Sequence, residues 1–172
     1  MKLKDIAKIQ TGVYKKPDFD GDIIYLQAKH FCETGFLKSV DELTMDLKQT
    51  DKLEKHILKN KDILFAAKGD KNFAFIYDNS IWLATASSTF FVIKIGRENQ
   101  NKILPEYLHW YLNHPNTIKY LKTQAKGSAL PSVSKSSLEN LIVPMPVIKK
   151  QKKVLKLNKL AKKKIIIKKN YD

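Results

Sequence analysis

The stretch Lys126–Lys153, KGSALPSVSKSSLENLIVPMPVIKKQKK, decides the fold of this chain. It begins with a Gly-Ser turn and a run of hydroxyl residues, continues through a short apolar stretch and ends in a lysine-rich segment. Pro144 and Pro146 stand between the last two parts. Proline cannot lie inside a helix and favours an extended backbone in the residue before it, so the chain must change direction there. This predicts a compact domain over residues 1–146 and a protruding helix over residues 147–172.

The composition is that of a folded protein. The 172 residues suit one domain with an appendage. An apolar content of 43% and an aromatic content of 10% argue against a disordered basic tail. The single cysteine, Cys32, excludes an internal disulfide, and neither a signal-peptide pattern nor an apolar run of the roughly 20 residues that span a membrane is present. These features predict a cytoplasmic protein without a membrane segment.

The net charge of +15 predicts a polyanionic partner. About two-thirds of the excess lies in residues 149–172, which hold eleven lysines against Asp172 alone. A solvated helix face is the ordinary explanation of such a lysine run, and it stays open beside polyanion binding. Binding to a membrane surface ranks last, because no interfacial Trp or Phe stands opposite the polar face.

Short patterns along residues 1–125 predict alternating strands and helices. Runs of β-branched and aromatic residues predict strands at Ile23–Leu26, Ile63–Ala66, Phe73–Tyr77 and Phe90–Ile95. Helical spacing of apolar residues predicts short helices within Asp41–Leu58 and longer ones at Leu104–Leu112 and Asn116–Ala125. The aromatic residues of the longer helices recur at helical spacing, so we expect them in the core. The predicted fold class is α/β (α+β), with a mixed or mainly antiparallel sheet and peripheral helices.

Few residues suggest catalysis. The chain lacks a phosphate-binding loop, and it lacks the glycine motif and the Asn-Pro-Pro-Tyr-like site of an adenosylmethionine-dependent methyltransferase. His30 has no second His or Cys at metal spacing, so no zinc site is expected. Pro17-Asp18, Asp46 and Lys48 match a short nuclease pattern, which arises often by chance in Lys- and Asp-rich chains. Because Lys48 is expected in a helix and not on a strand, a metal-dependent nuclease is a minor alternative.

The C-terminal segment reads as one helix from about residue 147 to residue 169. Its apolar stripe has coiled-coil spacing, and a wide apolar surface on a solitary helix gains nothing in water, so the helix is expected to pack against something. A central asparagine within such a stripe is a known way to fix pairing. The expected pairing residues are Val154, Leu157, Asn158, Ala161 and Ile165.

Together these features resemble one family, the specificity (S) subunits of type I restriction-modification enzymes. In that family a target recognition domain ends in a Gly-x-x-x-Pro-x-(Ile/Val)-Ser segment and an (Ile/Leu)-x-x-(Ile/Val)-Pro-x-Pro stretch, after which a helix begins. The matching residues here are Gly127, Pro131, Val133, Ser134, Leu138, Leu141, Ile142, Pro144 and Pro146. The strand that ends at Ala66 and its following loop are also similar, with Lys68 in place of the usual arginine. Lysine offers a compact charge without the arginine fork that reads guanine, so a phosphate contact is expected of Lys68.

The resemblance implies a non-catalytic protein that recognises double-stranded DNA and docks methyltransferase and restriction subunits, with no cofactor of its own. The DNA-binding residues that we expect lie foremost in two loops: Lys68, Lys71, Asn72, Lys126, Ser128, Ser132, Ser134 and Lys135. Lys29 and His30, in a third loop, are secondary candidates. A generic basic protein that oligomerises and binds nucleic acid without sequence preference remains the alternative.

The chain differs from a full S subunit in having one recognition domain and one helix where that family has two of each. A homodimer joined through the terminal helix would restore the two-domain plan and read a bipartite site with inverted repeats. The rival interpretation is that the chain is half of a longer S subunit.

Overall fold

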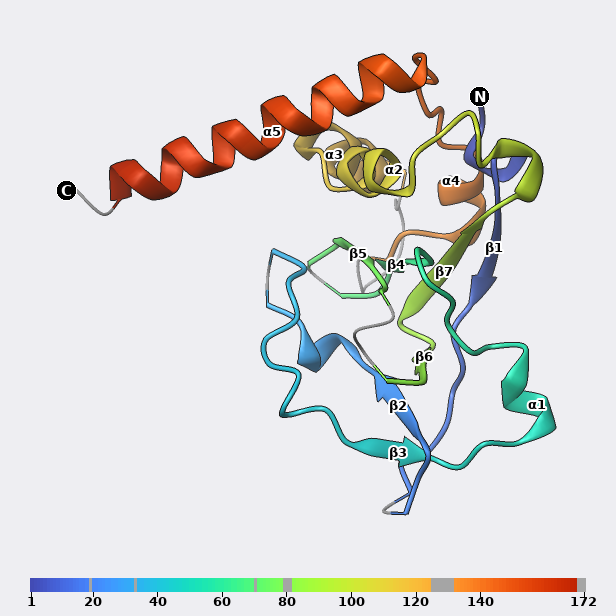
Figure 1. Cartoon of the computed structure of the whole chain (residues 1–172). Coiled ribbons are helices and arrows are strands. Elements are labelled where there is room, and N and C mark those ends of the chain that lie inside the picture. The colour runs from blue at the N-terminus through green and yellow to red at the C-terminus, as the bar shows by residue number, and fades with distance from the viewer. Residues whose placement is uncertain (19, 33, 70, 79–81, 125–131, 170–172) are drawn as a thin grey trace.

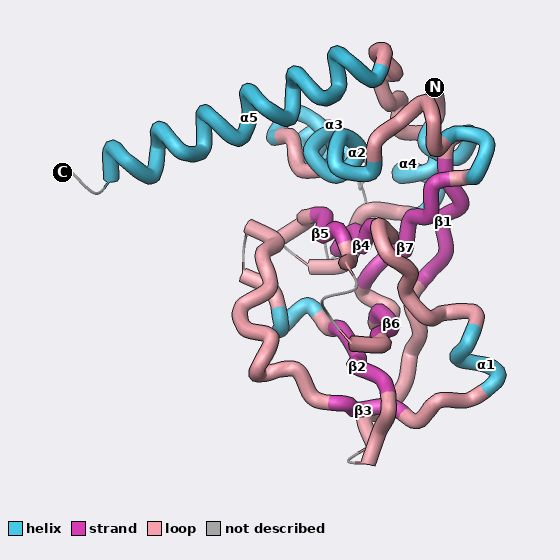
Figure 2. Tube along the Cα trace, viewed as in Figure 1, coloured by secondary structure: helices cyan, strands magenta, loops and turns pink. Residues whose placement is uncertain are grey.

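The computed structural model describes residues 1–169 apart from 19, 33, 70, 79–81 and 125–131, and in the last helix it describes side chains up to Ala161. Figure 1 shows three layers: a group of helices, a central sheet below it and a smaller sheet at the far end. Figure 2 shows that loops make up much of the layer that contains the smaller sheet. The predicted α/β fold class is confirmed, although the strands form two sheets where one was expected.

The central sheet has four antiparallel strands in the order β1-β7-β4-β5. These are β1 (Ala7–Thr11), β7 (Phe90–Ile95), β4 (Ile63–Ala66) and β5 (Ala74–Ile76). Strand β4 is buried along its whole length because both faces of the sheet are covered. Its Ile63 and Phe65 join a core beneath the helices, whereas Leu64 and Ala66 join a second core against the smaller sheet. This alternation explains why the sequence of β4 is continuously apolar.

The smaller sheet has the order β3-β2-β6, with β2 antiparallel to β3 and parallel to β6. These strands are β3 (Met45–Leu47), β2 (Ile23–Leu26) and β6 (Ala84–Ala86). The prediction of helices within Asp41–Leu58 was largely wrong, because only α1 (Asp51–Glu54) forms there. Leu47 pairs with Ile23 and is buried beside it, so tertiary pairing overrides the helical spacing of the leucines.

The helical layer consists of α2 (Pro105–Leu112), α3 (Pro115–Thr123) and the short α4 (Lys135–Glu139). Proline occupies the first position of both α2 and α3, where its missing N–H costs no hydrogen bond. Three single 3₁₀ turns, η1 (Leu3–Asp5), η2 (Ala28–His30) and η3 (Arg97–Asn99), complete the described short elements. The prediction that the apolar residues of α2 and α3 belong to the core is confirmed for Tyr107, Leu108, Leu112 and Leu121. Tyr111 and Ile118 pack against this core but are only partly buried.

The C-terminal helix α5 (Ile148–Lys169) begins directly after the Pro-Met-Pro turn. Figure 1 shows it crossing the helical layer and projecting beyond it. Its first turns contact α2, and Val154 and Leu155 pack against the core, so the start of α5 is attached to the domain. A division of the chain into residues 1–146 and 147–172 therefore stays a prediction. Within the described part of the chain, no helix is both long and apolar enough to cross a membrane.

Candidate nucleic-acid interface

Two of the loops that the sequence predicts to bind DNA meet in the structure. Lys68, just after β4, forms an isolated antiparallel bridge with Ser132, which precedes α4. The N–H of Val133 donates to the carbonyl oxygen of Ala67 at 2.8 Å. The polar residues of the β4–β5 loop and of the segment before α4 are therefore presented together, although they lie far apart in the sequence.

The β4–β5 loop, residues 67–73, is held in one shape by backbone and side-chain contacts. The N–H of Ala67 donates to the carbonyl oxygen of Thr89 at 3.0 Å, and the Asn72 side-chain amide donates to that of Ala66 at 2.9 Å. Gly69 has a φ of +98°, a conformation that favours glycine where the loop reverses. The side-chain amide of Asn72 thus bonds to the backbone of its own loop, whereas Lys68 and Lys71 are exposed on the loop.

A third segment, the hairpin of residues 31–37, lies against this loop. Phe31 bridges to Leu37, and the Phe31 ring packs against Phe73 and Phe75 with centroid distances of 5.4 and 5.0 Å. Gly35 has a φ of +79°, and a Cβ on it would lie 2.8 Å from the ring of Phe73. The hairpin approaches Phe73 so closely that only glycine fits at position 35.

Lys29 and His30 lie in η2, immediately before the hairpin. The Nδ1 atom of His30 accepts from the N–H of Gln27 at 3.2 Å, which leaves the ring proton on Nε2. Burial lowers the pKa of His30, and the nearby positive charge of Lys29 lowers it further. The ring is consequently neutral at pH 7, and its Nε2–H is the donor that it could offer to a nucleic acid.

The predicted residues around α4 have structural contacts of their own. Ser134 caps α4, because its Oγ accepts from the N–H of Ser137 at 3.0 Å. The Lys135 ammonium lies 3.4 Å from the Glu139 carboxylate, one helical turn away. A DNA contact by Ser134 or Lys135 stays a prediction, and so does one by the half-buried Ser132. Lys126 and Ser128 lie outside the described residues.

Sequence reasoning missed Phe36, at the end of the hairpin. Phe36 is 62% exposed, an unusual state for phenylalanine, and it stands two residues before the exposed Lys38. On a DNA duplex, an exposed apolar ring can meet a thymine methyl group or insert between base steps. The signal in the sequence is the Gly35-Phe36 pair in a short polar stretch between two strands.

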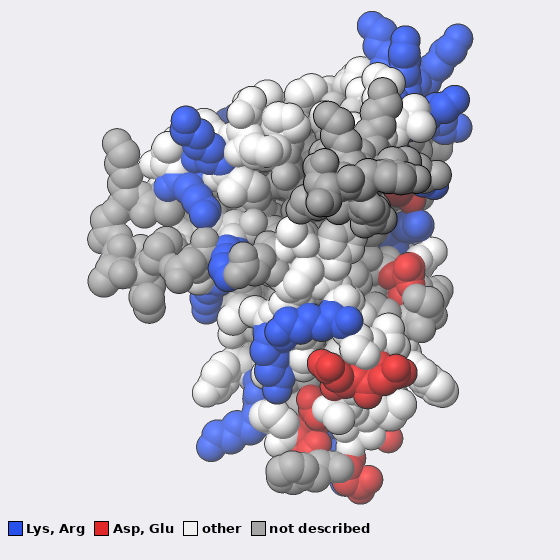
Figure 3. Space-filling model, turned by 90° about the vertical axis from the view of Figure 1, so that its left-hand side faces the viewer, with Lys and Arg blue, Asp and Glu red and all other residues white. Residues whose placement is uncertain are grey.

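Several acidic residues gather in one region, which extends as far as His30, because Asp46 lies close enough to act on its pKa. On the face in Figure 3, they collect at the lower right, whereas Lys and Arg spread over the upper part and the left. Asp18 and Asp46 from the nuclease-like pattern come together, since the N–H of Asp18 donates to the carbonyl oxygen of Asp46 at 2.6 Å. Lys48 directly follows β3, so its expected place in a helix was wrong, and it pairs with Asp20 at 3.4 Å.

No group of three or more His, Cys, Asp or Glu side chains among the described residues is arranged to hold a metal ion. The acidic region would instead repel phosphate. It therefore favours an approach of DNA from the side of the lysine-bearing loops.

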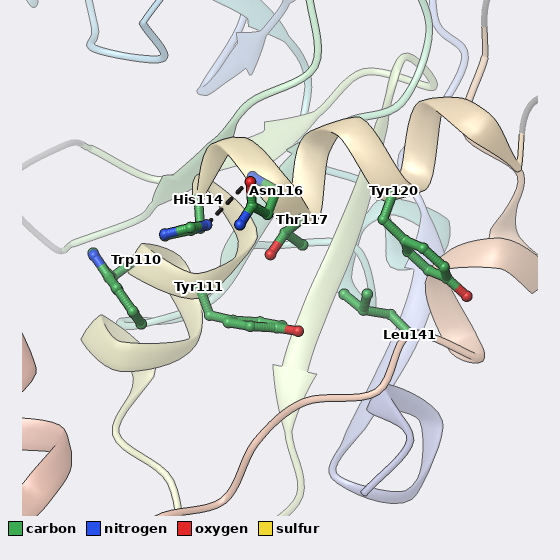
Figure 4. Close-up of a pocket in the computed structure, with 7 residues that line it drawn as sticks. All are labelled: Trp110, Tyr111, His114, Asn116, Thr117, Tyr120 and Leu141. Carbon is green, nitrogen blue, oxygen red and sulfur yellow. Dashed lines mark hydrogen bonds between the residues drawn. The ribbon is translucent and has the colours of Figure 1, made fainter.

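A cavity of about 300 Å³ opens between α2 and α3 (Figure 4). Tyr111 borders it and donates its hydroxyl to the carbonyl oxygen of Ile142 at 2.8 Å. The side chains that line it are mainly aromatic: Trp110, Tyr111, His114, Asn116, Thr117, Tyr120 and Leu141. Of the expected DNA-binding residues that the structure describes, none lines this cavity, so the cavity is separate from the described part of the candidate interface.

The expected pairing residues of α5 differ in exposure. Val154 is half-buried against the core of its own chain, whereas Leu157 is 57% exposed and Ala161 is also exposed. Asn158 is half-buried, and the side chain of Ile165 lies outside the described part. Pairing through α5 stays a prediction, and the exposed part of its stripe begins after Val154.

Comparison with known proteins supplies the family. The family of type I restriction modification DNA specificity domains matches residues 1–171. The specificity subunit of the type I restriction enzyme MjaVIII from Methanocaldococcus jannaschii is 36% identical over 61 residues, which are 35% of this chain and 14% of that protein.

Solved structures agree at the level of the fold. The HsdS subunit from Thermoanaerobacter tengcongensis aligns with a TM-score of 0.65 and 13% identity over 97% of this chain. An S subunit from M. genitalium aligns with a TM-score of 0.52 and 12% identity over 82% of it. The chain spans 38% of the first and 32% of the second. The family match over almost the whole length shows that this chain belongs to the type I restriction-modification DNA specificity domain family.

Proposed function

We propose that this chain is a target recognition domain that binds double-stranded DNA and reads one half of a bipartite site. The specificity-subunit family to which it belongs is non-catalytic, so its contribution is selective binding. The observation that carries the proposal is the bridge between Lys68 and Ser132, which unites two polar loops beside the hairpin of residues 31–37. Three loops fastened to rigid strands offer both charge for phosphates and side chains for base edges.

In this proposal, different loop residues contact phosphates and bases. Lys68 and Lys71 are exposed ammonium groups and suit phosphates, which position the protein without reading sequence. The ring of His30 and the side chain of Phe36 are better suited to bases, since one offers a single fixed donor and the other an apolar face.

We also propose that two copies pair through α5. A single domain contacts few base pairs, and each correct pair discriminates by only about 1–3 kcal/mol, too little to single out one site in a genome. A second copy would double the recognition and give the site inverted repeats. The rival is that this chain is half of a longer subunit.

In this proposal methyltransferase and restriction subunits dock on the paired protein. Methyl donor, ATP and nuclease metal would all be bound by those subunits, because sequence motifs for the methyl donor and for a phosphate-binding loop are missing from this chain.

Selection of bound duplexes from a random pool tests the proposal. The expected result is enrichment of one short motif that occurs twice as an inverted repeat. In a competition assay, unrelated duplex should displace the protein from a scrambled site at a lower competitor concentration than from the selected site. Equal displacement of both would favour a generic basic protein over a target recognition domain.

A further inference from the structure

Gln151, in the first turn of α5, is fully buried and joins three segments. Its Oε1 accepts from the N–H of Leu104 at 2.9 Å. Its Nε2 donates to the carbonyl oxygens of Lys102 at 2.8 Å and Pro146 at 2.7 Å. Every one of these partners is a backbone group, so the position of Gln151 depends on the path of the chain and not on a mobile side chain. One amide thus ties α5 to the start of α2 and to the Pro-Met-Pro turn.

The contacts divide α5 into an attached and a projecting part. Beyond Gln151, Val154 and Leu155 pack against the core, and the following residues are mostly exposed. Leu157 is 57% and Leu160 49% exposed. The direction of the projecting part is therefore set by the turn that holds Gln151 and the next turn, which holds Val154 and Leu155. The hydrogen bonds of Gln151 depend on angle, so they fix the direction more strictly than the apolar contacts do.

A small rotation at this anchor has a large effect at the other end of the helix. From Gln151 to Lys169 the helix is about 27 Å long at roughly 1.5 Å per residue. A tilt of about 10° would move its end by about 5 Å, which exceeds the roughly 3.4 Å between successive base pairs. If two copies pair through their helices, the tilt in each copy changes the separation of the two domains.

We infer that Gln151 is a positioning residue, which fixes the direction of α5 and thereby the number of base pairs between the two half-sites. The inference rests on the proposed pairing through α5. It assigns to one buried amide a specificity role that involves no contact with DNA. Removing the amide leaves the N–H of Leu104 and the carbonyl oxygen of Lys102 without their partner, which loosens the anchor.

The first experiment measures the direction of α5 without DNA. Spin labels are placed at Lys8→Cys on β1 and Lys159→Cys on α5 in a Cys32→Ser background, and the labelled protein is diluted with unlabelled protein so that only distances within one chain are recorded. We expect one narrow distance distribution for this background and for the control Lys153→Ala, whose side chain is exposed beside Gln151. Gln151→Ala and Gln151→Met should broaden it.

Near-UV circular dichroism establishes whether each variant keeps its fold. Gln151→Met preserves the length of the side chain, so it carries the test if Gln151→Ala fails to fold. Unchanged width in a folded variant overturns the inference. Loss of the fold in both variants would also overturn it, because Gln151 would then support the whole domain and not the direction of one helix.

The second experiment measures spacing on DNA. Duplexes carry the two selected half-sites separated by gaps that increase one base pair at a time. We expect the unmodified protein and Lys153→Ala to prefer one gap, and the Gln151 variants to lose that preference while keeping the same half-site motif. A broadened distance distribution with an unchanged gap preference refutes the role in spacing. A half-site motif without any gap preference in the unmodified protein refutes the proposed pairing, while recognition of a half-site stands.

Discussion

At the scale of single residues, charge and exposure separate two kinds of DNA contact. Lys68 bridges to Ser132 through its backbone. Its ammonium group lacks the planar, two-pronged donor geometry with which arginine reads guanine. Phe36 is 62% exposed on the hairpin, so we propose an apolar contact with a base for it. The two residues should therefore affect binding differently.

Lys68→Ala should lower the dependence of log affinity on log salt concentration by about one unit, because one fewer phosphate contact releases one fewer counterion. Affinity for the selected and for a scrambled duplex should fall by a similar factor. Fluorescence anisotropy at several salt concentrations measures both. Lys52→Ala, on α1, serves as the control, and equal slopes for the two variants would place Lys68 outside the interface.

Phe36→Ala should weaken binding to the selected site by roughly fivefold to tenfold, about 1 kcal/mol, the lower end of what one specific base contact contributes in a duplex. Binding to scrambled duplex should change little, since no charge is removed. Val40→Ala removes a side chain of comparable exposure, 50%, and is the matched control. The same loss on both duplexes would show that Phe36 does not read the site.

At the scale of elements, the strands that are buried on both faces of their sheet are the ones that the sequence predicts most clearly. β2 and β4 are buried along their whole length, so their sequences are continuous apolar runs. β3 has three residues with Met45 exposed, and it holds its place only by pairing with β2, for which a single sequence carries no signal. The bridge between Lys68 and Ser132 is a long-range pairing of the same kind. The sequence therefore pointed to Lys68 and Ser132 as candidates, but it could not predict that they pair, and it missed Phe36.

The hairpin of residues 31–37 offers a test of how it is attached. Gly35→Ala should destabilise the protein by about 1–3 kcal/mol, because alanine is strained at a φ of +79° and its Cβ would meet Phe73. Gly69→Ala is the matched control: its φ is +98°, but nothing lies within 4 Å of the added Cβ. Urea unfolding should rank Gly35→Ala as the less stable variant. An equal loss in both would mean that contact with Phe73 does not hold the hairpin.

Removal of the attached part of α5 should lower the free energy of unfolding more than removal of the projecting part. Deleting residues 157–172 removes, among the described side chains, four exposed ones and the half-buried Asn158, so it should leave the free energy of unfolding nearly unchanged. Deleting residues 149–172 also removes Gln151 and should cost at least about 1–3 kcal/mol for the buried backbone groups left unpaired. Urea unfolding of the two truncations side by side measures the difference. Equal stability would contradict the attachment of α5 through Gln151.

At the scale of the whole molecule, the arrangement of charge and of apolar surface suggests two separate contacts. Acidic residues gather at one end of the face in Figure 3, away from the helices, so DNA should approach the lysine-bearing loops and avoid that end. In the stripe of α5, Leu157 and Ala161 are exposed, and the helix projects beyond the domain (Figure 1), where a second chain can reach it. A protein that binds DNA through loops and another copy through a helix keeps the two surfaces independent.

Leu157→Asp should therefore abolish pairing without loss of the fold. The leucine side chain is 57% exposed in a single chain, so a carboxylate there is solvated in the monomer but would be buried in a paired helix seam, where an unpaired charge is costly. Light scattering at tens of micromolar protein should give twice 19.8 kDa for the unmodified chain and 19.8 kDa for Leu157→Asp. Lys156→Asp, which adds a carboxylate at the neighbouring exposed position, should remain a dimer. A mass of 19.8 kDa for the unmodified chain would contradict the homodimer and favour the interpretation of this chain as half of a longer subunit.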